Sequence, residues 1–177
     1  MAGAGESGRR RVRRTAALVL LALALPLPGS AEDDDQARAG VRAVDKSAEA
    51  LLAAGCSRSA TFRAIVDELT RSDVVVYVAV RPLDLPGQLQ FLSASEWFRY
   101  VCVSVRKPGL ATEQIAWLAH ELTHAVEIAR ATEVRDVRSL RRLYERIGDG
   151  GRHGSRFESG AAQATWTKVL VELRGSR

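Results

Sequence analysis

The segment at residues 114–130 constrains the fold of this chain more than any other part of the sequence. It contains neither proline nor glycine, and its apolar side chains recur every three or four residues, which predicts one amphipathic α-helix. Within it, residues 120–124 read His-Glu-Leu-Thr-His. Successive helical residues turn by about 100°, so His120 and His124 lie about 40° apart on adjacent turns. Two imidazole rings in this arrangement can bind one zinc ion.

Glu121 follows the first histidine of this HExxH pattern. Its carboxylate lies one step further around the helix, where it can reach a water molecule on the metal rather than the metal itself. A chance match is the alternative, because the pattern fixes only three positions. Two of the three histidines in the chain fall within it, which favours metal binding.

A catalytic zinc site needs a third protein ligand and keeps one position open. Glu158, at the start of the last predicted helix, is our preferred candidate. It could instead be an acid that interacts with the positive end of the helix dipole. His153, in the glycine-rich segment at residues 148–156, is the other candidate.

Glu127 lies three residues after His124 on the metal-facing side of the predicted helix. Helical side chains lean toward the N-terminus, so its carboxylate can accept a hydrogen bond from the free ring nitrogen of His124 and orient that ligand. Direct metal ligation and a solvated acid remain alternatives for Glu127.

The remaining pattern predicts an α+β fold, with a small antiparallel sheet of about three strands. Two helices precede the sheet, and the HExxH helix and two further helices follow it. The predicted helices are residues 36–54, one capped by Ser59, then 114–130 capped by Thr112, 136–147 and 158–173, and the predicted strands are 73–80, 88–92 and 97–106.

Residues 1–31 resemble a secretory signal peptide, with five arginines, a short apolar run at 16–25 and small residues before the expected cleavage site. We therefore expect one exported domain at residues 32–177. The formal net charge of +5 falls to +1 once the five basic residues and one acid of residues 1–31 are removed. We expect no nucleic-acid partner, no membrane association after cleavage, and a monomer.

Two cysteines remain in the expected mature chain, Cys56 and Cys102. An oxidising compartment permits a disulfide between them. Two buried free thiols are the equal alternative, since the distance between them cannot be read from the sequence.

With His120, Glu121 and His124, the chain resembles the zincin metallopeptidases, and Glu158 is similar to the third ligand of their gluzincin branch. It is also similar to small exported bacterial proteins with an HExxH helix. The resemblance implies a Zn²⁺-dependent hydrolase of peptide or protein substrates, in which Glu121 is the general base and a strand edge pairs with extended substrate.

An oxyanion donor is also expected, and the candidates are Tyr144, Tyr100, His153 and Arg156. The alternative function is a non-catalytic exported domain that zinc stabilises, used for binding or structure. A helical scaffold that holds no metal is the third possibility.

Overall fold

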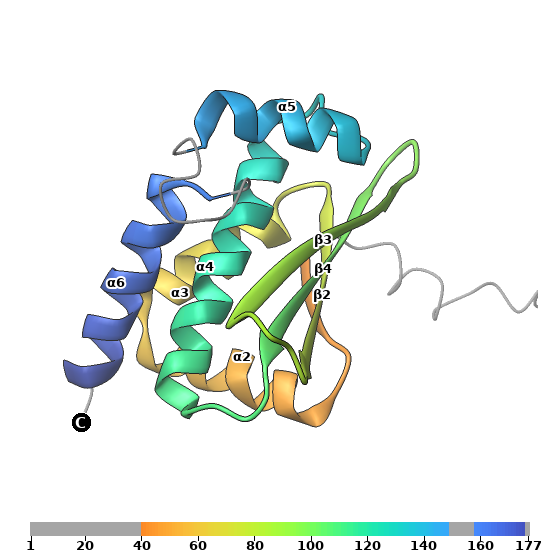
Figure 1. Ribbon diagram of the computed structural model, residues 1–177. Helices are drawn as coiled ribbons and strands as arrows, with labels where there is room; N and C mark the ends of the chain where they lie inside the picture. Colours follow the sequence, from red (N-terminus) through yellow and green to blue (C-terminus); the bar gives the residue numbers. More distant parts are fainter. Residues whose placement is uncertain (1–39, 149–157, 176–177) are drawn as a thin grey trace, which may run out of the picture.

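The computed structural model describes residues 40–148 and 158–175 (Figure 1). It has an α+β fold, which confirms the predicted class. The predicted leader at residues 1–31 and most of the glycine-rich segment lie outside the described residues. The strands are β1 (Gly40–Ala43), β2 (Val74–Arg81), β3 (Gly87–Ala94) and β4 (Arg99–Arg106), and the helices are α2 (Lys46–Arg58), α3 (Ala60–Thr70), α4 (Ala111–Arg130), α5 (Val137–Ile147) and α6 (Gly160–Gly175).

The sheet is mixed and four-stranded, so the predicted antiparallel sheet of about three strands is only partly correct. The order is β1-β2-β4-β3, with β2 parallel to both neighbours and β3 antiparallel to β4. The apolar run of β2 is buried on most of its length, which suits a central strand with parallel neighbours. In β3, polar residues alternate with apolar ones, which suits an edge.

The predicted helix at residues 36–54 is only partly correct, because the described part of this stretch begins with β1 and becomes helical only in α2. The strand pairs with β2, and α2 starts only after Asp45, whose side chain accepts a hydrogen bond from the backbone N–H of Ala48. The helix also continues through Gly55, beyond the predicted end at residue 54. A side chain at Gly55 would lie 2.8 Å from the ring of Phe62, so this glycine permits close packing of α2 on α3.

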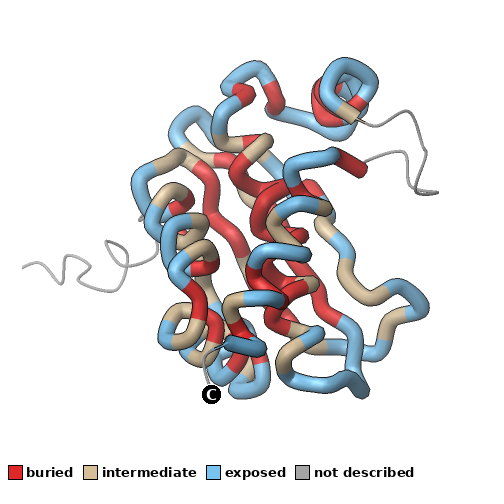
Figure 2. Tube along the Cα trace, turned by 90° about the vertical axis from the view of Figure 1, so that its left-hand side faces the viewer, coloured by how far each residue is buried: buried red, intermediate tan, exposed pale blue. Residues whose placement is uncertain are grey.

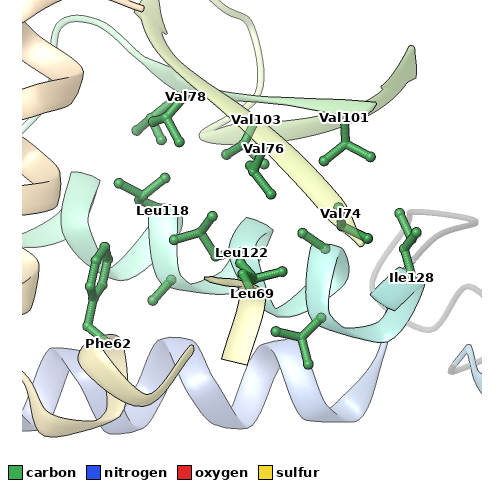
Figure 3. Packing of buried hydrophobic residues seen from close by; sticks show 14 of the residues in the cluster. Phe62, Leu69, Val74, Val76, Val78, Val101, Val103, Leu118, Leu122 and Ile128 are labelled. Carbon is green, nitrogen blue, oxygen red and sulfur yellow. The ribbon is translucent and has the colours of Figure 1, made fainter. Parts of the chain in front are cut away.

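Helices α2, α3 and α4 cover one face of the sheet, and α6 packs against α4 and α3 from outside (Figure 1). Helix α4 is therefore enclosed between the sheet and α6, and its central turns are buried (Figure 2). Valines of β2 and β4 meet Leu118, Leu122 and Ile128 of α4 in the core (Figure 3). This enclosure fixes the position of the helix that contains the HExxH pattern.

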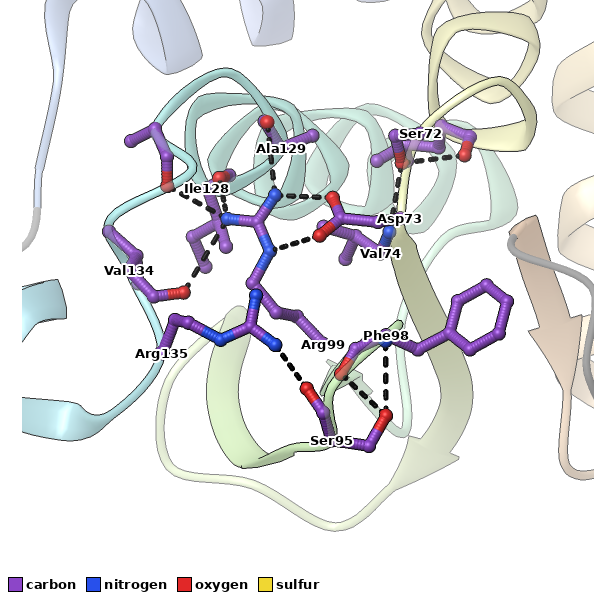
Figure 4. Close-up of polar contacts among 12 residues, drawn as sticks. Ser72, Asp73, Val74, Ser95, Phe98, Arg99, Ile128, Ala129, Val134 and Arg135 are labelled. Carbon is purple, nitrogen blue, oxygen red and sulfur yellow. Dashed lines mark hydrogen bonds and ion pairs between the residues drawn. The ribbon is translucent and has the colours of Figure 1, made fainter.

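The C-terminal end of α4 is held by Arg99, a fully buried side chain at the start of β4 (Figure 4). Its guanidinium donates hydrogen bonds to the backbone carbonyls of Ile128, Ala129 and Ala131, and it forms an ion pair with Asp73. Carbonyls at a helix end have no partner within the helix. Arg99 satisfies them and links α4 to the sheet.

The N-terminal end of α4 differs from the prediction. The helix begins at Ala111, so Thr112 lies inside it and does not cap it; Leu110 is the capping residue and makes no side-chain hydrogen bond there. Across residues 40–148 and 158–175, no helix has the length and apolar character needed to span a membrane.

Both cysteines are free, so they form no disulfide, but they are half-buried rather than buried as the second alternative stated. Cys56 packs against the core from α2. Cys102 alternates along β4 with Val101 and Val103, which belong to that core, so its side chain points from the opposite face of the sheet. The sheet lies between the two thiols.

Candidate metal centre

His120 and His124 of α4 meet Glu158, the residue that precedes Ser159 and α6. The Oε1 atom of Glu158 lies 3.4 Å from Nε2 of His120 and 3.9 Å from Nε2 of His124. The three side chains are buried, and their ligand atoms all lie within 4.8 Å of one another. Two imidazole nitrogens and a carboxylate oxygen at this spacing could hold a metal ion.

The start of α6 places Glu158 in the cluster. Ser159 caps this helix, since its Oγ atom accepts a hydrogen bond from the backbone N–H of Ala162. The backbone N–H of Ser159 in turn donates to Oε1 of Glu158 over 3.0 Å. The carboxylate is therefore oriented by the backbone turn that begins the helix, and α6 is itself packed along α4.

Glu127 joins the three helices around the cluster. Its Oε2 atom lies 2.9 Å from Nδ1 of His124 and accepts a hydrogen bond from the hydroxyl of Tyr144, while its Oε1 atom accepts one from Oγ of Ser159. The hydrogen bond expected between Glu127 and His124 is present. Because it occupies Nδ1, it leaves Nε2 of His124 to face Glu158 and a metal.

The charges in this network differ between the two histidines. Burial opposes a positive charge on His124, but the hydrogen bond that its ring donates to Glu127 and the nearby carboxylates outweigh burial and raise its pKa. Burial, assisted by the neighbouring His124, lowers the pKa of His120 to about 4. His120 is therefore neutral at neutral pH, the form that coordinates metals. Its ring also meets that of Trp117 edge-on, with 5.2 Å between the centroids.

Glu121 lies beside the cluster and beneath β3. Only 6% of the residue is exposed. Burial, together with the negative charge of Glu158, raises the pKa of Glu121 to about 7, although His124 lowers it. A carboxyl group whose pKa lies near 7 is suited to general acid and base chemistry near neutral pH.

A cleft of about 620 Å³ opens onto these side chains. One wall is the strand β3 with the loop before it, and the other walls come from α4, α5 and the start of α6. Apart from the two histidines, Glu121 and Glu158, the lining residues carry no charge; they are Leu85, Pro86, Gly87, Gln88, Leu89, Gln90, Phe91, Trp117, Val137, Leu140, Tyr144 and Gln163.

The other candidates from the sequence fall in different places. Tyr144 lines the cleft, but its hydroxyl donates to Glu127. Tyr100 does not line the cleft, because the alternation along β4 turns it to the sheet face away from α4. His153 and Arg156 lie outside the described residues. Ser159 was not among the residues predicted for the site. Its position as a small polar residue before a helix is the sequence feature that could have identified it.

No family model matches this chain, and no curated protein or solved structure is significantly similar to it.

We expect Glu127→Gln to weaken zinc binding by about 10–100-fold, the usual effect of losing a partner that orients a ligand. The amide offers one acceptor oxygen where the carboxylate serves His124, Tyr144 and Ser159. Competition with a chromophoric chelator measures the affinity. Glu145→Gln, which removes the same charge from an exposed position on α5, is the matched control. Equal affinities of the two variants would show that Glu127 does not orient the ligand.

Proposed function

We propose that this protein is a zinc-dependent peptide hydrolase of the gluzincin type. The proposal rests on one observation above all: the two histidines of an HExxH helix converge with Glu158 at the base of a cleft, and Glu121 lies beside them. The absence of another charged side chain from the described cleft lining is consistent with a site built around this cluster.

Zinc is the proposed metal because of the donor set. Imidazole suits zinc, copper, iron and nickel, whereas calcium and magnesium prefer sites made of oxygen atoms. Two histidines and one glutamate are a frequent ligand set of hydrolytic zinc sites. Bound there, the ion would supply Lewis acidity, which polarises the scissile carbonyl and activates water.

Glu121 is the proposed general base. It accepts a proton from the attacking water and passes it to the leaving amine. These two proton transfers need a carboxyl group whose pKa lies near the working pH. The raised pKa of Glu121 supports this role. Glu127 keeps His124 in the tautomer that coordinates through Nε2.

Strand β3 is the proposed platform for an extended substrate. The backbone N–H of Arg106 donates to the carbonyl of Pro86, so the next opposed pair, Gly87 and Val105, is a pair without hydrogen bonds across the ladder. By alternation, Gly87, Leu89 and Phe91 direct their N–H and C=O groups to the open edge. A peptide can pair with these groups as an added strand.

The cleft favours a large apolar side chain in the substrate. Phe91 of β3 lines the cleft together with Val137 and Leu140 of α5, and Val137 is 56% exposed although it is apolar. Burying that surface against a leucine or phenylalanine of the substrate contributes on the order of 1–3 kcal/mol. We therefore propose cleavage next to such residues.

Metal removal and reloading test the proposal. We expect the protein to bind one zinc ion per chain by elemental analysis, and to cleave a mixed library of quenched fluorescent peptides. Chelation should abolish cleavage, and added zinc should restore it. Mass spectrometry of the products then locates the cleaved bonds relative to apolar residues.

Two results would contradict the proposal in different ways. A zinc content near zero after reloading would rule out both proposed functions, the zinc-dependent hydrolase and the zinc-stabilised domain. One bound zinc ion without any cleavage across the library would leave a zinc-stabilised domain with no hydrolytic activity.

A further inference from the structure

Gly87 of β3 lies against Glu121 of α4. A Cβ atom built on Gly87 would lie 2.7 Å from Oε1, 2.8 Å from Cγ and 3.1 Å from Cδ of Glu121. Separations under 3.0 Å between such atoms are not tolerated, so one of the two residues would have to move. The carboxylate of Glu121 thus occupies the volume that any other residue at position 87 would need.

Position 87 requires glycine because there is no room for a Cβ atom, and not because of its backbone conformation. Among the described glycines, Gly40 has a positive φ of 135°, whereas Gly87 does not lie in that region. An alanine could adopt the backbone of Gly87 without strain. Its methyl group would nevertheless enter the volume of the carboxylate.

The strand and the helix that bear the two residues are both held in place. Strand β3 is fixed by its register with β4, where Gly87 opposes Val105 and Arg106 donates to the carbonyl of Pro86. Glu121 is buried on the central helix of the fold. The flexible part of the glutamate side chain would therefore be pushed along the cleft, out of its observed position.

We propose that Gly87 is a positioning residue, which keeps the edge of β3 clear so that Glu121 can lie between the strand and the metal ligands. This inference rests on the proposed function for its catalytic consequence. The steric contact itself is independent of catalysis. The two parts can therefore be tested separately.

A thermodynamic cycle on the metal-free protein tests the contact. We expect Gly87→Ala to lower the melting temperature by about 2–10 °C, as overpacking of an enclosed site does. In the background of Glu121→Ala, which removes all three atoms in the contact, the same glycine change should have little effect. If the melting-temperature changes of the two single variants simply add in the double variant, the inference is overturned. If Gly87→Ala alone does not fold, recovery of a folded double variant supports it, and failure of the double variant contradicts it.

Kinetics test the consequence. Gly87→Ala should lower kcat about 100-fold, the scale of an ångström misplacement of a reacting group, while KM and zinc affinity change less than threefold. Gly109→Ala, whose added Cβ meets the side chain of Gln114, is the control and should keep full activity. Unchanged kcat in a folded Gly87→Ala protein would overturn the positioning role. If the unaltered protein cleaves no peptide, the proposed function fails, and the melting cycle still decides the contact.

Discussion

Glu121→Gln is expected to lower kcat/KM for the proposed peptide hydrolysis by a factor of about 10²–10⁴, the usual contribution of a general base. The amide has the size of the carboxyl group but cannot accept the proton of the attacking water. Zinc affinity should stay close to that of the unaltered protein, since Glu121 does not belong to the ligand cluster. Fluorogenic cleavage and chelator competition on the same preparation measure both quantities. The matched control is Glu113→Gln, an exposed position in the first turn of the same helix.

The pH dependence gives a second measurement of the same role. In the metal-free protein, burial raises the pKa of Glu121 to about 7, and a cation in the cluster would favour the ionised form and lower it. With zinc bound, hydrolysis should therefore fall only at a pH below 7, where the carboxylate of Glu121 takes up a proton. Glu121→Gln should remove this acid limb from whatever rate remains. A variant that retains both the rate and the limb would show that another group is the base.

The local part of the site was predictable because one helix contains it. His120, Glu121, His124 and Glu127 lie within two turns, so helical geometry fixes their relative directions from the sequence alone. The hydrogen bond between His124 and Glu127 follows from the same spacing. Glu158 could be proposed only as a candidate, because its position depends on how α6 packs along α4. Ser159 and Tyr144 reach Glu127 through the same tertiary contacts.

The sheet was harder to predict than the helices. The sequence pattern predicted strands at the positions of β2, β3 and β4, but such a pattern does not state which strands become neighbours. The chain passes from β2 to the edge position of β3 and returns with β4 between them. Gly87 then faces Glu121 across this edge, a contact that no sequence spacing reveals. Strand β1 was missed because Val41 and Val44 also fit a helical period with the apolar residues of α2.

Glu158→Ala removes the proposed ligand that is farthest from the two histidines in the sequence. We expect it to lower zinc affinity more than the other substitutions described above. The loss should exceed the about 10–100-fold effect of an orienting partner such as Glu127, because only the two histidines on adjacent turns of α4 remain of the described cluster. Isothermal titration with zinc measures the affinity. Gln163→Ala, which alters the cleft wall on α6 but none of the three residues of the cluster, is the control.

Thermal unfolding distinguishes the loss of a ligand from the loss of a fold. A ligand that binds only the folded state raises the melting temperature by mass action, so zinc should stabilise the unaltered protein and the Gln163→Ala control. It should not stabilise Glu158→Ala. In chelator, Glu158→Ala should melt close to the unaltered protein. It loses the hydrogen bond from the Ser159 N–H, but removing the carboxylate relieves its repulsion of buried Glu121. If Glu158→Ala still binds zinc tightly, the third ligand lies elsewhere, and His153→Ala becomes the variant that must lose it.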